Sequence, residues 1–263
     1  MKIKRALVIS AAFLAVIQMG TTAALASPIV FDFANGGMRT GLGNEIVLTM
    51  DGLTATLRGY SVNKSGGDFT ISEVTRWGTG AGNCNGSSTE PAQSRNCSSP
   101  NHAVDNGGND NRIDVLYVEF TSMVTETLAD VLLHQAMISS WSSDFDVSYW
   151  AGTGFLDFTE LNLAELTGLS VGGRYDDDFG GTTSNGQTRP VNFAIESPVN
   201  WIVFGAQVPE ASVVTFSSNK DHKNDAFKFK LLTVEEQQVP APGVVFLLGA
   251  GMLALGWSRR RRR

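Results

Sequence analysis

Short segments in which apolar and polar residues alternate are the feature that most constrains the fold of this chain. Such alternation occurs at residues 29–33, 46–50, 53–60 and 115–120, and a period of two is typical of strands with one buried face. Further candidate strands, separated by clusters of Gly, Asn, Ser and Asp, are 127–138, 146–150, 155–163, 189–195, 201–206 and 227–234. Strands at this spacing predict an all-β fold, a jelly-roll-like β-sandwich of two sheets. The stretch 158–166, which overlaps the candidate strand at 155–163, could instead form a short helix.

The N-terminal end has the pattern of a helical secretory signal peptide at residues 1–26. Its basic residues are Lys2, Lys4 and Arg5, and an apolar run follows at 6–17. The small residues of the expected cleavage site are Ala24, Ala26 and Ser27. The sequence therefore predicts that the chain is exported and that its mature domain begins at Ser27.

The C-terminal end combines a proline pair, an apolar run at 243–257 and a cluster of basic residues. These basic residues are Arg259, Arg260, Arg261, Arg262 and Arg263. Because moving arginine through hydrocarbon is costly, the apolar run can enter a bilayer as a transmembrane helix while the arginines stay cytoplasmic and stop transfer. A run of about 15 residues is shorter than the roughly 20 that span a bilayer comfortably, which favours a transient anchor.

A proline pair, a helix and an arginine cluster in this order resemble the PEP-CTERM sorting signal of Gram-negative bacteria, which here would occupy residues 239–263. The motif residues are Val239, Pro240, Ala241 and Pro242; the family has Glu where this chain has Ala241. The resemblance implies that an exosortase, a membrane transpeptidase, cleaves near the motif and passes the chain from the inner membrane to the cell surface or extracellular matrix. An ordinary tail anchor that stays uncleaved is the alternative.

A second, weaker resemblance lies inside the expected ectodomain at 27–238. The segment H-A-V-D-N-G-G that begins at His102, and the segment 141–152, are similar to the β-rich ectodomains of exosortase-dependent surface proteins. This resemblance implies no catalytic activity, and we expect that the protein is not an enzyme.

The charge of the expected ectodomain excludes one class of partner. Residues 27–238 hold all 26 acidic residues and 12 of the 20 basic ones, so their net charge is −14. Such a domain repels phosphate backbones, and we expect no nucleic-acid partner. Divalent cations and cationic polymers remain plausible partners.

Cys84 and Cys97 are the two cysteines of the chain. An oxidising periplasm predicts a disulfide between them. A thiol metal site would need more ligands than the nearby His102 supplies.

Several residues could carry chemistry, but each also has a structural interpretation. Residues 168–172 match G-x-S-x-G around Ser170, with His222 as the one histidine that follows; however, turn residues rather than a helix follow Ser170, which argues against a nucleophile elbow. Candidate carboxylates for glycoside hydrolysis are Glu119, Asp144, Asp146 and Glu160. Candidate sugar-stacking aromatics, more often core residues, are Trp141, Tyr149, Trp150 and Trp201.

Two acidic clusters could bind calcium, since both offer carboxylate oxygens on glycine-containing loops. Their residues are Asp105, Asp110 and Asp114 in one cluster and Asp176, Asp177 and Asp178 in the other. Neither has EF-hand spacing, and solvated Asx-turn loops are the alternative.

Taken together, these patterns predict an exported, non-enzymatic surface or extracellular-matrix protein. Its expected partners are an exosortase-like transpeptidase, the inner membrane during sorting, and an exopolysaccharide. The alternative functions are a secreted carbohydrate-binding or hydrolytic domain and a calcium-stabilised adhesin.

Overall fold

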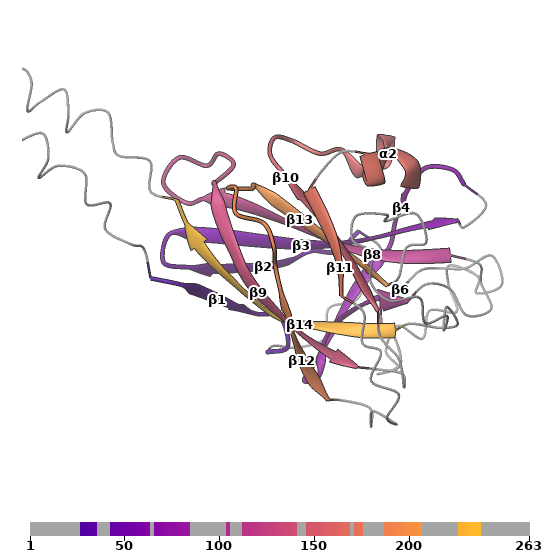
Figure 1. Cartoon of the computed structure of the whole chain (residues 1–263), viewed down its shortest axis with the longest axis horizontal. Helices are drawn as coiled ribbons and strands as arrows, with labels where there is room; N and C mark the ends of the chain where they lie inside the picture. Colours follow the sequence, from indigo (N-terminus) through magenta and orange to yellow (C-terminus); the bar gives the residue numbers. More distant parts are fainter. Residues whose placement is uncertain are drawn as a thin grey trace, which may run out of the picture. The chain divides into compact units, whose positions relative to one another are not determined.

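The structure, a computed structural model, describes residues 27–35, 43–63, 66–84, 104–105, 112–140, 146–168, 171–175, 187–206 and 226–237. A compact unit spans Pro28–Gln237 and holds all the described strands (Figure 1). The predicted signal peptide at 1–26 and the predicted sorting signal at 239–263 lie outside the described residues. Within the described part of the chain, no helix has the length and apolar character needed to cross a membrane.

Sheet A is built around its longest strand, β14. Its strands are β1 (Ile29–Asp32), β5 (Glu73–Trp77), β6 (Gly80–Cys84), β7 (Val104–Asp105), β9 (Val131–Ser140), β12 (Thr188–Asn192) and β14 (Ala226–Glu236). The order is β12-β9-β14-β6-β5, and β1 and β7 also pair with β14. All pairs are antiparallel. β9 lines one side of β14, and β1, β6 and β7 share the other side.

Sheet B is also antiparallel and has the order β11-β10-β13-β8-β3-β2, with β4 beside β3. Its strands are β2 (Ile46–Met50), β3 (Leu53–Asn63), β4 (Thr70–Ile71), β8 (Arg112–Ser122), β10 (Val147–Gly152), β11 (Val171–Tyr175) and β13 (Trp201–Ala206). The pairing of β3 with β8 runs over eleven residues, from Leu53 opposite Ser122 to Asn63 opposite Arg112.

The two sheets pack face to face around an apolar core. The ring centroids of Phe204 in β13 and Phe229 in β14 are 4.6 Å apart, and those of Phe31 in β1 and Phe120 in β8 are 6.4 Å apart. All four rings are fully buried, and burial of such large apolar surfaces is the main force that holds sheets together. The predicted all-β sandwich is confirmed, whereas its jelly-roll connection pattern stays a prediction.

A second apolar cluster covers part of the outer face of sheet B. It lies under η1 (Phe158–Glu160) and α2 (Leu163–Gly168). Phe158 stacks on Tyr60 of β3 with a centroid distance of 4.6 Å. Asn162 and Glu165 form a reciprocal capping box at the start of α2, because each accepts a hydrogen bond from the other's backbone amide.

The strand predicted at 155–163 is therefore wrong, and the alternative of a short helix within 158–166 is confirmed by η1 and the start of α2. Its apolar residues Leu156, Phe158, Leu161 and Leu163 pack on the outer face of sheet B, and the segment forms η1 and the start of α2 instead of a strand. The turn expected after Ser170 is also wrong over 173–175, since β11 pairs there with β10. The glycines of β11 have a packing role: a Cβ on Gly173 would lie 2.4 Å from the hydroxyl of Tyr149.

Candidate functional site

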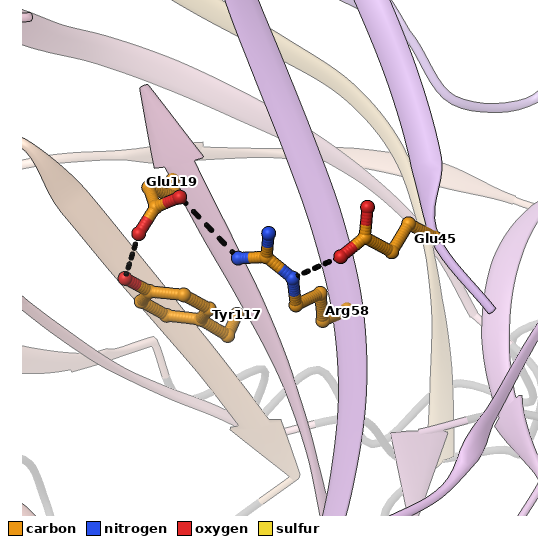
Figure 2. A network of polar contacts seen from close by, with 4 residues as sticks. All are labelled: Glu45, Arg58, Tyr117 and Glu119. Atoms are coloured by element: carbon orange, nitrogen blue, oxygen red, sulfur yellow. Dashed lines mark hydrogen bonds and ion pairs between the residues drawn. The ribbon is translucent and has the colours of Figure 1, made fainter. Parts of the chain in front are cut away.

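Four polar side chains on the outer face of sheet B form what we call the Arg58 network (Figure 2). Its members are Glu45, Arg58, Tyr117 and Glu119. In the register of β3 and β8, Arg58 lies opposite Tyr117, and Glu119 is two residues further along β8. Because side chains alternate along a strand, Leu57 faces the core and Arg58 faces outward.

The contacts of the network run from a buried hydroxyl to a half-exposed carboxylate. Arg58 Nε donates to Glu45 Oε1 over 2.6 Å, and Arg58 Nη1 donates to Glu119 Oε1 over 3.4 Å. The Tyr117 hydroxyl donates to Glu119 Oε2 over 3.0 Å. Both carboxylate oxygens of Glu119 therefore accept hydrogen bonds from within the protein, and its side chain is only 13% exposed.

The electrostatics of the network favour an arginine cation and a neutral tyrosine. Burial by itself lowers the pKa of Arg58, but its hydrogen bond to Glu45 and the charges of Glu45 and Glu119 outweigh burial and raise that pKa overall. Burial, followed by the charge of Glu119, raises the pKa of Tyr117 above its ordinary value. Tyr117 thus acts as a hydrogen-bond donor across the ordinary pH range.

This geometry suits a structural role better than catalysis. Arg58 joins the residue that precedes β2 to strands β3 and β8. Partly exposed ion pairs of this kind contribute about 0–1 kcal/mol each. Glu119, the one member of the network that the sequence offers as a candidate catalytic carboxylate, has both oxygens engaged by Arg58 and Tyr117.

The candidate carboxylates Glu119 and Asp146 do not lie close enough together to form a glycosidase pair. Across β13, Glu119 lies level with Gly152, the last residue of β10. Asp146 is buried just before the other end of that strand, about 20 Å away at roughly 3.3 Å per residue. Glycosidase carboxylates lie about 5–9.5 Å apart. Glu160 is exposed in η1, and Asp144 lies outside the described residues.

The candidate sugar-stacking aromatics are buried wherever the structure describes them, as the core interpretation expects. Tyr149, Trp150 and Trp201 are 5%, 1% and 3% exposed. Trp201 lies against Gly152, where a Cβ would approach the indole ring to 2.4 Å. These three rings therefore form no open platform, and Trp141 lies outside the described residues.

The G-x-S-x-G match is followed by a strand. Ser170 and His222 lie outside the described residues, but β11 begins directly after Ser170 at Val171. A nucleophile elbow requires a helix at that point. The backbone therefore argues against a hydrolase elbow, as the sequence did.

The structure brings together no calcium-binding set among the residues it describes. Asp114 is 2% exposed within β8, and Asp105 ends the short strand β7. Asp110, Asp176, Asp177 and Asp178 lie outside the described residues. Within the described part of the chain, no group of three or more His, Cys, Asp or Glu side chains could hold a metal ion. Calcium binding stays an untested alternative to solvated loops.

Cys84 is buried at the end of β6. Its expected partner Cys97 lies outside the described residues, so the disulfide also stays a prediction.

The predicted sorting residues follow closely after the last described residue. The backbone amide of Gln237, just after β14, donates to the carbonyl oxygen of Asp130 over 2.8 Å. Val239, Pro240, Ala241 and Pro242, together with Arg259, Arg260, Arg261, Arg262 and Arg263, lie outside the described residues. At the other end, Ser27 is described and exposed, whereas Ala24 and Ala26 are not described.

Sequence reasoning missed Arg58 and Glu45 as interacting residues. They are 13 residues apart and meet only because β2 and β3 form a hairpin. The available signal is the alternation of β3, which predicts that a charged residue beside Leu57 faces away from the core.

Comparison with known proteins found no matching family model, no similar curated protein and no similar solved structure.

Proposed function

We propose that this chain is the precursor of an exported, non-enzymatic surface or extracellular-matrix protein. In this proposal the leader directs export of the sandwich, and the PEP-CTERM-like tail holds the precursor in the inner membrane. An exosortase-like transpeptidase then cuts near residues 239–242. The released domain reaches the cell surface or the matrix, where an exopolysaccharide is a partner.

The observation that carries this proposal is the position of the motif relative to the last strand. β14 ends at Glu236, and Val239 follows Gln237 by two residues. Cleavage at the motif would therefore leave all of β14 in the released domain. Proline fixes φ, donates no backbone hydrogen bond and disfavours helix in the preceding residue. Pro240 and Pro242 therefore favour an extended segment that an enzyme can bind.

The polar groups of the sandwich support a structural role for the ectodomain. Glu119 is engaged within the Arg58 network, and the carboxylates that the hydrolase hypothesis pairs lie far apart. The carbohydrate-binding alternative has less support, because Tyr149, Trp150 and Trp201 are buried.

Cell fractionation tests the proposal with two full-length variants. Replacing all five arginines at 259–263 with serine should reduce retention of the precursor in the inner membrane, because nothing then opposes transfer of the tail. Replacing Pro240 and Pro242 with alanine should instead leave an uncut precursor in the membrane fraction. Fractionation identical to wild type for both variants would contradict the proposal.

A further inference from the structure

Three exposed apolar side chains gather at one end of the sandwich, and we call them the apolar tip. They are Met50 (43% exposed), Met123 (56%) and Val124 (87%). The backbone amide of Met123 donates to the carbonyl oxygen of Gly52 over 2.8 Å, which joins the β8–β9 loop to the β2–β3 turn. Met50 ends β2 directly before that turn, and Met123 and Val124 follow β8 in the loop. Adjoining exposed apolar residues indicate an interaction surface.

The last strand, β14, ends at the same end of the sandwich as the apolar tip. Glu236, the last residue of β14, pairs with Val131, the first residue of β9, and the β8–β9 loop directly precedes Val131. Figure 1 shows the β2–β3 turn, the β8–β9 loop, the start of β1 and the end of β14 together at the left. The apolar tip and the exit toward the tail therefore share one end of the sandwich.

The length of chain beyond this exit limits how far that end can lie from a membrane. Gln237 is held by its bond to Asp130, and the apolar run of the tail begins at Gly243. Six residue steps in a fully extended chain cover about 20 Å. An anchored precursor must therefore keep this end of the sandwich within about 20 Å of the bilayer surface.

From this geometry we propose that the apolar tip rests in the bilayer interface while the precursor is anchored, and leaves it once the tail is cut. This inference rests on the proposed membrane anchor. Three side chains bind a membrane only weakly by themselves, but a short tether raises their local concentration at the surface to the millimolar range. Cleavage removes the tether, and the contact is then lost.

The charges around the tip determine which lipid surface fits. Asp51, which follows Met50 in the β2–β3 turn, and Glu126, in the β8–β9 loop, are both exposed beside the tip. Carboxylates repel anionic headgroups, whereas the ammonium group of phosphatidylethanolamine can pair with them. The expected surface is therefore a zwitterionic, phosphatidylethanolamine-rich bilayer.

The test uses the full-length chain in vesicles of phosphatidylethanolamine and phosphatidylcholine. An environment-sensitive fluorescent amino acid replaces Val124 in one variant. In the control it replaces Ile71, an apolar residue that is 47% exposed. Ile71 lies opposite Tyr60 on β3. Tyr60 is about 23 Å along that strand from Leu53, the residue that pairs with Met50 of the tip. A quencher attached to the lipid acyl chains, together with the emission wavelength, reports contact with the bilayer.

We expect the probe at 124 to be quenched and shifted to shorter wavelength, and the probe at 71 to be unaffected. The further change Met123→Asp should reduce the quenching at 124 without changing how much protein floats with the vesicles. Floating protein with both probes unquenched would overturn the tip contact while leaving the anchor intact. Protein that does not float would overturn the anchor itself, and the tip contact with it.

Discussion

Asn83 donates a hydrogen bond from Nδ2 to the backbone carbonyl oxygen of Tyr60 over 2.7 Å. Asn83 belongs to β6 of sheet A and Tyr60 to β3 of sheet B, so this bond joins the two sheets. The Asn83 side chain also accepts a hydrogen bond from the hydroxyl of Ser72. With Asn83 only 2% exposed, these bonds satisfy polar groups that have little access to water.

The change Asn83→Ala should reduce the free energy of unfolding by about 1–3 kcal/mol, because it leaves buried polar groups of Tyr60 and Ser72 without a partner. Chemical denaturation measures this loss. The matched control is Asn192→Ala, which removes an exposed hydrogen bond of 2.8 Å from Gln135 and should change stability by no more than about 0.5 kcal/mol. Equal losses in the two variants would contradict an inter-sheet role for Asn83.

Gly59 provides the space in which the two sheets approach each other. A Cβ at this position would lie 2.6 Å from Asn83 Oδ1 and 2.9 Å from a methyl group of Val74. Gly59→Ala should therefore destabilise the protein by about 1–3 kcal/mol through overpacking. Gly78→Ala is the control, since a Cβ there meets nothing within 4 Å. A melting temperature that falls for Gly78→Ala and not for Gly59→Ala would refute this packing.

Tyr117 should make the folded protein sensitive to alkaline pH. Its pKa in the folded state is raised above the ordinary 10.0, chiefly by burial. Above pH 10.0 the unfolded chain therefore loses this proton first, and the free energy of unfolding falls as pH rises. Tyr117→Phe should make that fall shallower in denaturation series measured from neutral pH into the alkaline range. A slope that does not change would show that Tyr117 is not protected in the fold.

Lys228 should produce the opposite trend at lower pH. It is fully buried in β14, and burial lowers its pKa from 10.5 to about 8. From about pH 8 to pH 10.5 the unfolded chain binds this proton more tightly than the folded protein does. The contribution of Lys228 therefore makes stability rise with pH across that window.

Lys228→Met should remove this rise, as measured by the urea midpoint at several pH values from 7 to 10. Lys230→Met is the matched control, because Lys230 lies two residues along the same strand and is only partly buried. A rise that persists in Lys228→Met would assign the effect to another group.

Alternation of side chains made much of the sandwich predictable. The bounds of β2 and β13 match the predicted strands at 46–50 and 201–206. Prediction failed where tertiary contacts decide the structure. β6 and β11 are glycine-rich and become strands by pairing with neighbouring strands, while the apolar residues around Phe158 cover a sheet face and join no sheet.

The candidate site was less predictable than the fold. Arg58, Glu119 and Tyr117 come together through the register of β3 and β8, in which residues 61 positions apart in sequence become neighbours. No local pattern encodes such a register. The burial of Trp150 and Trp201 also depends on contacts between segments far apart in the sequence, since both lie in the apolar cluster beneath η1 and α2.

The mass of the mature C-terminus is the most direct test of the proposed sorting function. Protein recovered from the cell surface or the extracellular matrix should end near residues 239–242 and lack every peptide of the arginine-containing tail. Recovery of surface protein that still carries Arg259 to Arg263 would contradict cleavage by an exosortase-like enzyme.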